Sequence, residues 1–161
     1  MDERYTLYPR TLTFLLNGDE ILLMQRSPEA RLFPGMHNGV GGHVERGEDV
    51  LSAARREVRE ETGLDVPDLK LRGLLHVDEG ADRPGVLVFI FVGHVQQREV
   101  RPSPEGTLHW VPLARIHELT LLPDLPPLLA HVLGHAGDGG PIFARSTIPR
   151  DRGAWEIHFV T

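Results

Sequence analysis

Short apolar runs separated by turn residues recur along the chain, and this pattern predicts a protein rich in β-strands. Two such runs flank an Asn-Gly turn, so residues 11–26 are expected to form a hairpin. The next residues, 27–36, contain two prolines and a glycine and predict a loop. Further strands are expected over residues 70–77, 86–95, 107–111, 141–148 and 154–160. The run over residues 86–95 is apolar and continuous, which is typical of a central strand.

One stretch has the 3.6-residue period of an amphipathic helix. Between residues 49 and 62 the apolar residues Leu51, Ala54 and Val58 recur on one side, and Gly63 provides a C-terminal stop. Two shorter helices are expected over residues 112–119 and 127–133. Because strands and helices interleave, the predicted fold class is α/β (α+β), a mixed sheet with helices on its faces.

Composition narrows the class of protein. The chain has 161 residues, which fits a single domain over residues 1–161. It contains no cysteine, which excludes a disulfide framework, a Cys-ligated zinc site and a thiol nucleophile. No apolar run approaches the ~18 residues of a membrane span. The first residues also lack the basic and apolar regions of a signal peptide, so a cytoplasmic protein without a membrane partner is expected.

The charge balance argues against a nucleic-acid polymer as partner. The chain carries 23 acidic and 17 basic residues, with a formal net charge of -6. Polymer binding requires a basic surface. Part of the acidity is concentrated on one face of the predicted helix, where Glu57, Glu60 and Glu61 fall within an arc of about 100°. This face is either simply solvated or a site for a hard cation, because carboxylate oxygens suit Mg²⁺ and Mn²⁺.

The spacing around these glutamates favours the cation site. Residues 42–64 read Gly-x5-Glu-x7-Arg-Glu-Val-x-Glu-Glu-x-Gly-Leu. This resembles the Nudix box, Gly-x5-Glu-x7-Arg-Glu-U-x-Glu-Glu-x-Gly-U with U an aliphatic residue, at every defined position. The resemblance implies the Nudix fold, an α/β/α sandwich with a mixed β-sheet and a catalytic loop-helix-loop. It also implies attack of water on a phosphorus of a nucleoside diphosphate linked to another group.

The same resemblance assigns roles to the box residues. The divalent cation, Mg²⁺ with Mn²⁺ as a substitute, would be bound by Gly42, Glu57, Glu60 and Glu61. Outside the box, Glu105, five residues before Trp110, resembles a late glutamate of one Nudix branch that binds the metal or acts as base. Arg56 would hold a catalytic carboxylate and pair with Glu48, as an orienting partner of a metal site does. Gly63 is a structural position of the box. Glu57 and Glu105 both remain candidates for the general base.

Three stretches outside the box carry a further resemblance. Residues 11–26 match an opening hairpin, residues 37–42 resemble Trp-Asn-Gly-Phe/Val-Gly-Gly, and residues 122–124 read Leu-Pro-Asp. Together they look like the MutT and human MutT-homologue branch of sanitising triphosphatases. The resemblance implies a small nucleotide substrate such as 8-oxo-dGTP, hydrolysed to a nucleoside monophosphate and pyrophosphate. The implied substrate contacts are Thr11, Arg26, Asn38 and Asp124.

Structural explanations stand beside these functional ones. Asn38 could cap a turn, Asp124 could cap a helix, Glu105 could be a turn residue, and Trp110 could belong to the core.

The chain also departs from the branch pattern. His37 replaces the usual tryptophan, and the aromatic residues that should sandwich a purine are absent after Gly73. Stacking would then come from Phe14, Phe33 or Phe89.

Other functions remain open. The Ser-Gln-Pro-Trp-Pro sequence typical of NADH pyrophosphatases is missing. The alternatives are a Nudix pyrophosphatase acting on ADP-ribose, a dinucleotide or a sugar nucleotide, or a non-catalytic domain that binds a nucleotide. The sequence does not distinguish a monomer from a homodimer.

Overall fold

The computed structural model describes residues 4–134, 139–149, 151 and 153–160. Strands and helices interleave along the chain, as the sequence pattern predicts. In order they are β1 (Leu7–Asn17), β2 (Glu20–Arg26), β3 (His37–Asn38), α1 (Val50–Thr62), β4 (Lys70–Asp78), β5 (Gly85–His94), β6 (Gly106–Pro112), the 3-10 helix η1 (Leu113–Glu118), α2 (Leu125–Gly134), β7 (Ile142–Thr147) and β8 (Glu156–Val160).

The strands form one mixed sheet in the order β3-β2-β1-β5-β4-β7-β8, and β6 pairs with β2. The pairs β1–β5 and β4–β7 are parallel, whereas β1–β2, β4–β5 and β7–β8 are antiparallel. The continuous apolar strand β5 lies between β1 and β4, so the prediction of a central strand is confirmed. The predicted opening hairpin is also present, with Gly18 in the left-handed region at φ +59°.

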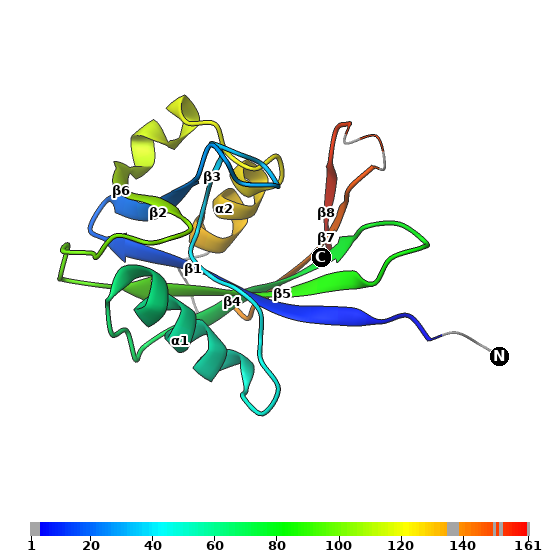
Figure 1. Ribbon diagram of the computed structural model, residues 1–161, viewed down its shortest axis with the longest axis horizontal. Helices are drawn as coiled ribbons and strands as arrows, with labels where there is room; N and C mark the ends of the chain where they lie inside the picture. Colours follow the sequence, from blue (N-terminus) through cyan, green and yellow to red (C-terminus); the bar gives the residue numbers. More distant parts are fainter. Residues whose placement is uncertain (1–3, 135–138, 150, 152, 161) are drawn as a thin grey trace.

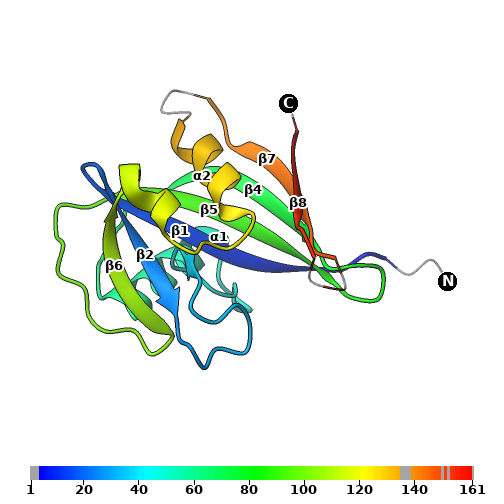
Figure 2. The same ribbon diagram turned by 90° about the horizontal axis from the view of Figure 1, so that it is seen from above.

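Helices cover both faces of this sheet (Figures 1 and 2). Alternation along β1 shows how the two faces are filled. Phe14 packs in one core cluster with Leu128 of α2, and the next residue, Leu15, packs in a second cluster with Val58 of α1. The predicted α/β/α sandwich is therefore confirmed.

Helix α1 begins and ends on signals in the sequence. The Asp49 carboxylate accepts hydrogen bonds from the backbone N–H groups of Leu51 and Ser52, at 3.0 and 2.9 Å. At the other end Gly63 is left-handed, with φ +79°, and its N–H donates to the Arg59 carbonyl at 2.9 Å. These caps hold both ends of the helix that carries the box glutamates.

Tertiary contacts shift some boundaries. Strand β1 begins at Leu7, earlier than the hairpin predicted, because it pairs with β5 along its whole first half. The helix expected from Pro112 is a 3-10 helix that begins one residue later, since Pro112 still pairs with Glu20 in the β2–β6 ladder. Among the described residues, no helix is long and apolar enough to cross a membrane.

Candidate active site

Arg56 lies at the centre of a carboxylate network on α1. Its guanidinium donates to Glu48 at 2.7 Å, to Glu57 at 2.9 Å and to Glu60 at 3.2 Å. It also donates to the His43 carbonyl at 3.0 Å, which ties the loop before the helix to the helix itself. The hydrogen bond to Glu48 is the main cause that raises the pKa of Arg56, so the cation is permanent. Arg56 thus orients two box glutamates and holds the Glu48 loop beside them.

Glu61 faces the other way and is only 5% exposed. One carboxylate oxygen accepts a hydrogen bond from the Gly41 N–H at 3.0 Å. Burial raises the pKa of Glu61 to about 8, and the neighbouring Glu105 and Glu57 add to this shift. A cation bound beside Glu61 would offset the repulsion among these three carboxylates.

Glu57 lies between Arg56 and the glycine-rich segment. Its side chain is 14% exposed, and burial raises its pKa. A Cβ atom at Gly42 would lie 2.4 Å from Glu57 Oε1, so only glycine allows this carboxylate to lie against the backbone. The Gly42 carbonyl accepts a hydrogen bond from the Thr11 N–H at 2.8 Å. Its role as a metal ligand stays a prediction.

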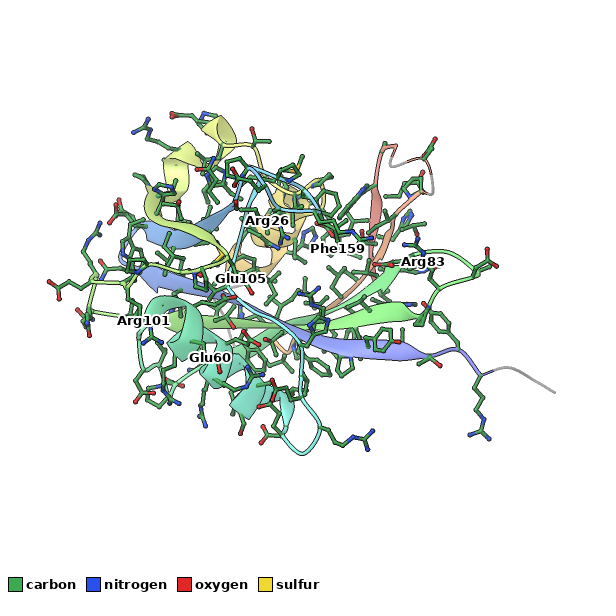
Figure 3. The ribbon with its side chains drawn as sticks, viewed as in Figure 1. Arg26, Glu60, Arg83, Arg101, Glu105 and Phe159 are labelled. Atoms are coloured by element: carbon green, nitrogen blue, oxygen red, sulfur yellow. The ribbon has the colours of Figure 1, made fainter. Side chains whose placement is uncertain are left out.

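Glu105 reaches the acidic helix from the loop that precedes β6 (Figure 3). Its backbone N–H donates to Ser103 Oγ at 3.2 Å, and its carbonyl accepts from the Ser27 N–H at 3.4 Å. The turn explanation is therefore confirmed, whereas the role of Glu105 as a metal ligand or base stays a prediction. The backbone of Glu105 forms a turn, and its side chain lies beside Glu61.

The donor set fits a hard divalent cation. Glu57, Glu61 and Glu105 repel one another electrostatically, and all of their donor atoms are oxygens. In the part of the chain that the structure describes, no three acidic or histidine side chains converge into a ready metal cage. The full ligand set expected from the sequence is therefore not assembled among the described residues, and the metal role of these glutamates stays a prediction.

A cavity of about 260 Å³ lies beside Glu61 and Glu105, on the α2 side of the sheet. All of the predicted substrate contacts line it, namely Thr11, Arg26, Asn38 and Asp124. Its apolar wall is built by side chains of β1, β4, β5 and α2, namely Leu12, Leu75, Val77, Val86, Val88, Leu125 and Leu128. The fold therefore brings residues from distant parts of the chain to one hollow next to the acids.

Asn38 and Asp124 are the polar residues that could read a base. Asn38 Oδ1 accepts the Gly39 N–H at 2.9 Å, so its turn-capping role is real. Asp124 is 9% exposed, and burial raises the pKa of its carboxyl group. In its neutral form that group is both a donor and an acceptor. Its backbone carbonyl accepts the Leu128 N–H at the start of α2.

Thr11 and Arg26 make structural hydrogen bonds at the rim of the cavity. The Thr11 hydroxyl accepts the Gly42 N–H at 3.4 Å, which fastens β1 to the box. Arg26 Nε donates to the Leu32 carbonyl at 2.8 Å, which closes the loop over residues 27–36. Direct contact of either residue with a substrate stays a prediction.

The structure distinguishes among the aromatic residues considered for stacking. Phe14 is completely buried in the core, and Phe89 packs against the α1 cluster on the other face. Phe33 lines the cavity, in the left-handed region at φ +51°. Trp110 donates its Nε1–H to the Arg98 carbonyl and packs against the α1 cluster, which agrees with a structural role.

The sequence reasoning missed two residues that line the cavity, Arg10 and Trp155. Trp155 makes an edge-to-face contact with Phe33, with ring centroids 5.2 Å apart. No local signal marks Trp155, because it reaches the cavity from the C-terminal hairpin. For Arg10 the signal was available, since it alternates with Leu12 on β1 and so faces the same side of the sheet.

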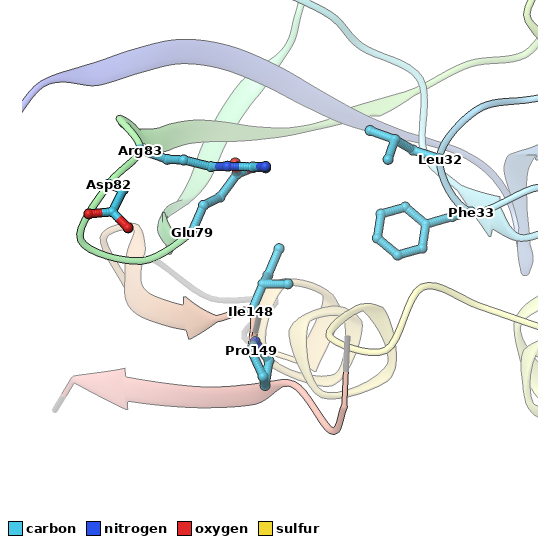
Figure 4. Close-up of a pocket in the computed structure, with 7 residues that line it drawn as sticks. All are labelled: Leu32, Phe33, Glu79, Asp82, Arg83, Ile148 and Pro149. Atoms are coloured by element: carbon cyan, nitrogen blue, oxygen red, sulfur yellow. The ribbon is translucent and has the colours of Figure 1, made fainter. Parts of the chain in front are cut away.

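A second cavity of about 490 Å³ adjoins the first (Figure 4). The two share Leu32, Phe33, Glu79 and Ile148. Arg83, on the turn between β4 and β5, extends along this outer cavity. The hollow beside the acidic helix therefore continues beyond the Phe33 ring.

Comparison with known proteins agrees with this fold. A NUDIX domain model matches residues 7–132, and the chain belongs to the Nudix family.

Two curated relatives and one solved structure are similar to it. An NAD-capped RNA hydrolase NudC from Pseudomonas aeruginosa is 43% identical over 120 residues, which are 74% of this chain and 39% of that protein. The NudC of Stutzerimonas stutzeri is 34% identical over 120 residues, 74% of this chain and 40% of that protein. The crystal structure of a MutT protein from Bacillus halodurans superposes with a TM-score of 0.80 and 26% identity, covering 95% of this chain and 97% of that one. The chain thus spans about two fifths of the length of these curated relatives.

Proposed function

We propose that this chain is a divalent-metal-dependent Nudix hydrolase that cleaves a nucleoside triphosphate to a nucleoside monophosphate and pyrophosphate. The observation that carries the proposal is the cavity in which Asn38 and Asp124 lie near Glu61 and Glu105. A nucleobase held there places its phosphates beside the carboxylates. An oxidised purine triphosphate such as 8-oxo-dGTP is the leading candidate, which corresponds to sanitation of the cytoplasmic nucleotide pool.

In this proposal the metal is held by Glu57, Glu60, Glu61 and Glu105 with the Gly42 carbonyl. Bound Mg²⁺ or Mn²⁺ supplies neutralisation of the phosphate oxygens and a more acidic water. Glu57 or Glu105 accepts the proton of the attacking water, because both are carboxylates at the edge of the site. Arg56 keeps Glu57 and Glu60 in position through its hydrogen bonds.

Recognition of the base combines three contacts. The Phe33 ring offers a stacking surface, and Asn38 and Asp124 offer polar groups. Compared with guanine, 8-oxoguanine has a donor at N7 and an acceptor at C8. The Asp124 carboxyl group lines the cavity and has an acceptor oxygen for the N7–H, a donor that guanine lacks. This match is the feature that supports an oxidised purine over an unmodified one.

The test is release of pyrophosphate and phosphate from a panel of nucleotides, with and without Mg²⁺. We expect metal-dependent release of pyrophosphate, fastest with an oxidised purine triphosphate. A preference for ADP-ribose or a sugar nucleotide overturns the triphosphate assignment. Nucleotide binding without any hydrolysis identifies a non-catalytic domain instead.

Hydrolysis of a dinucleotide is a second candidate. It is favoured by the 43% identity to a protein named as an NAD-capped RNA hydrolase, and by the outer cavity, which offers room beyond one nucleotide. NAD and an NAD-capped RNA therefore belong in the same panel. Faster cleavage of free NAD than of any triphosphate would support this candidate, and cleavage of the capped RNA alone would overturn the expectation of a small-molecule substrate.

A further inference from the structure

Glu105 stands at the end of the loop over residues 95–105, which joins β5 to β6. The start of this loop is fixed, because Asn17 Nδ2 donates to the Val95 carbonyl at 2.8 Å. Its end is shaped by the hydrogen bond from the Glu105 N–H to Ser103 Oγ. Between these points the loop runs past the C-terminal end of α1.

There Arg101 fastens the loop to the helix by hydrogen bonds (Figure 3). Its guanidinium donates to the Arg59 carbonyl at 2.6 Å and to the Glu60 carbonyl at 3.2 Å. Its backbone N–H donates to the Thr62 carbonyl at 2.9 Å. The last carbonyls of a helix lack intrahelical partners, and a cation near them is favourable. Arg101 therefore stabilises the turn that carries Glu60.

Gly63 makes this contact possible. A Cβ atom at position 63 would lie 3.1 Å from Cγ and 3.2 Å from Cδ of Arg101, a tighter approach than ordinary packing. The last glycine of the box thus has two uses. It ends the helix in the left-handed conformation, and it leaves room for the arginine stem.

We propose that Arg101 is a positioning residue, which sets the distance between the Glu105 carboxylate and the glutamates in the last turn of α1. The argument is one of connectivity. Glu60 and Glu61 belong to the turn that Arg101 holds, and Glu105 follows shortly after Arg101 on the same loop. One guanidinium nitrogen, Nη2, bridges the Arg59 and Glu60 carbonyls, and the Arg101 backbone N–H holds the Thr62 carbonyl, so side chain and backbone together restrict this loop. Both consequences rest on the metal site of the proposed function, and Mn²⁺ affinity is measured apart from hydrolysis so that the positioning role and the proposed reaction can fail separately.

The test begins with Arg101→Met, which keeps a long apolar stem beside Gly63 and the backbone hydrogen bond to Thr62, and removes every side-chain donor. Mn²⁺ affinity is measured by titration calorimetry, and nucleotide hydrolysis by pyrophosphate release. We expect about a 10-fold loss in both Mn²⁺ affinity and kcat, the size typical of residues that orient metal ligands. KM for the nucleotide should stay within about twofold, because Arg101 does not line the base cavity. Arg101→Lys should recover part of the loss.

Arg98→Met is the matched control. Arg98 lies on the same loop, pairs with Glu20 and stacks over the Trp110 ring, so its side chain is engaged by β2 and β6. Its replacement should leave Mn²⁺ affinity and kcat within about twofold of the unaltered protein. An equal loss in both variants would mean that any disturbance of the loop suffices, and would overturn a specific role for Arg101.

A double-mutant cycle decides whether Arg101 acts through Glu105. In a Glu105→Gln background, Arg101→Met should change Mn²⁺ affinity by less than about twofold, because the group being positioned is already gone. A full additional loss there overturns the proposal. If Arg101→Met does not fold by circular dichroism, Arg101→Lys enters the same cycle. Absence of nucleotide hydrolysis with an intact Mn²⁺ cycle contradicts only the proposed function.

Discussion

The Glu105 side chain lies beside Glu61 at the wall of one cavity, although Glu61 belongs to α1 and Glu105 to the loop before β6. Burial and the neighbouring charge of Glu105 raise the pKa of Glu61 to about 8. A cation bound beside Glu61 would favour its ionised form, which links the protein's stability, its metal binding and its pH dependence.

The first prediction concerns the stability of the metal-free protein. Folding raises the Glu61 pKa from its ordinary value of 4.5 to about 8, so the folded state binds more protons than the unfolded state between these values. Stability should therefore fall as pH rises from about 4.5 to 8, and Mg²⁺ should restore it at the upper end. Melting temperatures between pH 5 and 8, with and without Mg²⁺, measure this.

Glu61→Gln is the informative variant for that experiment, because an amide cannot ionise. We expect its metal-free melting temperature to vary less across the same pH range. Glu60→Gln is the matched control, since 59% of the Glu60 side chain is exposed, and it should keep the slope of the unaltered protein. A slope that persists unchanged in Glu61→Gln would contradict the assignment.

The second prediction concerns the box glutamates as metal ligands. Glu60→Gln and Glu61→Gln should each lower kcat by about 100-fold or more while leaving the circular dichroism spectrum unchanged. Glu45 is exposed and lies in the loop before α1, so Glu45→Gln should keep kcat near the value of the unaltered protein. A near-normal rate in either of the first two variants would remove that residue from the ligand set.

The third prediction concerns Asp124 as a base reader. Replacing Asp124 by Ala removes a buried polar group that faces the cavity, and leaves the donors and acceptors of the base without a partner. Such a loss is worth about 1–3 kcal/mol, so kcat/KM for the preferred purine triphosphate should fall about 10-fold or more. The ratio between oxidised and unmodified purine nucleotides should move toward one. An unchanged ratio would assign Asp124 to the start of α2 alone.

The fourth prediction concerns the Phe33 ring. Phe33→Gly removes the ring at a position with φ +51°, a conformation that glycine adopts without strain, so the backbone should persist. Loss of an aromatic stacking partner should lower kcat/KM by roughly 10-fold. Phe143→Ala is the control, because Phe143 is 53% exposed and lies outside the cavity lining. Equal kinetics in the two variants would exclude Phe33 as a stacking surface.

Local patterns in the sequence were enough to predict the parts of this protein that depend on near neighbours. The helical period between residues 49 and 62, with Asp49 before it and Gly63 after it, predicted α1 almost to the residue. The same period placed Glu57, Glu60 and Glu61 within about one and a half turns of the helix. The Asn-Gly turn and the continuous apolar run predicted the opening hairpin and the central strand for the same reason.

Only the tertiary structure decided which distant residues meet. The contact of Glu105 with Glu61 and the pairing of Phe33 with Trp155 join segments that no periodicity connects. The raised pKa of Asp124 comes from burial by other elements, which a chain read residue by residue does not reveal. The sequence by itself determined the helix and the box of charges, because helices form from local hydrogen bonds. Packing determined where the cavity lies and brought Glu105 beside the box glutamates, because sheet order and loop docking depend on contacts across the whole fold.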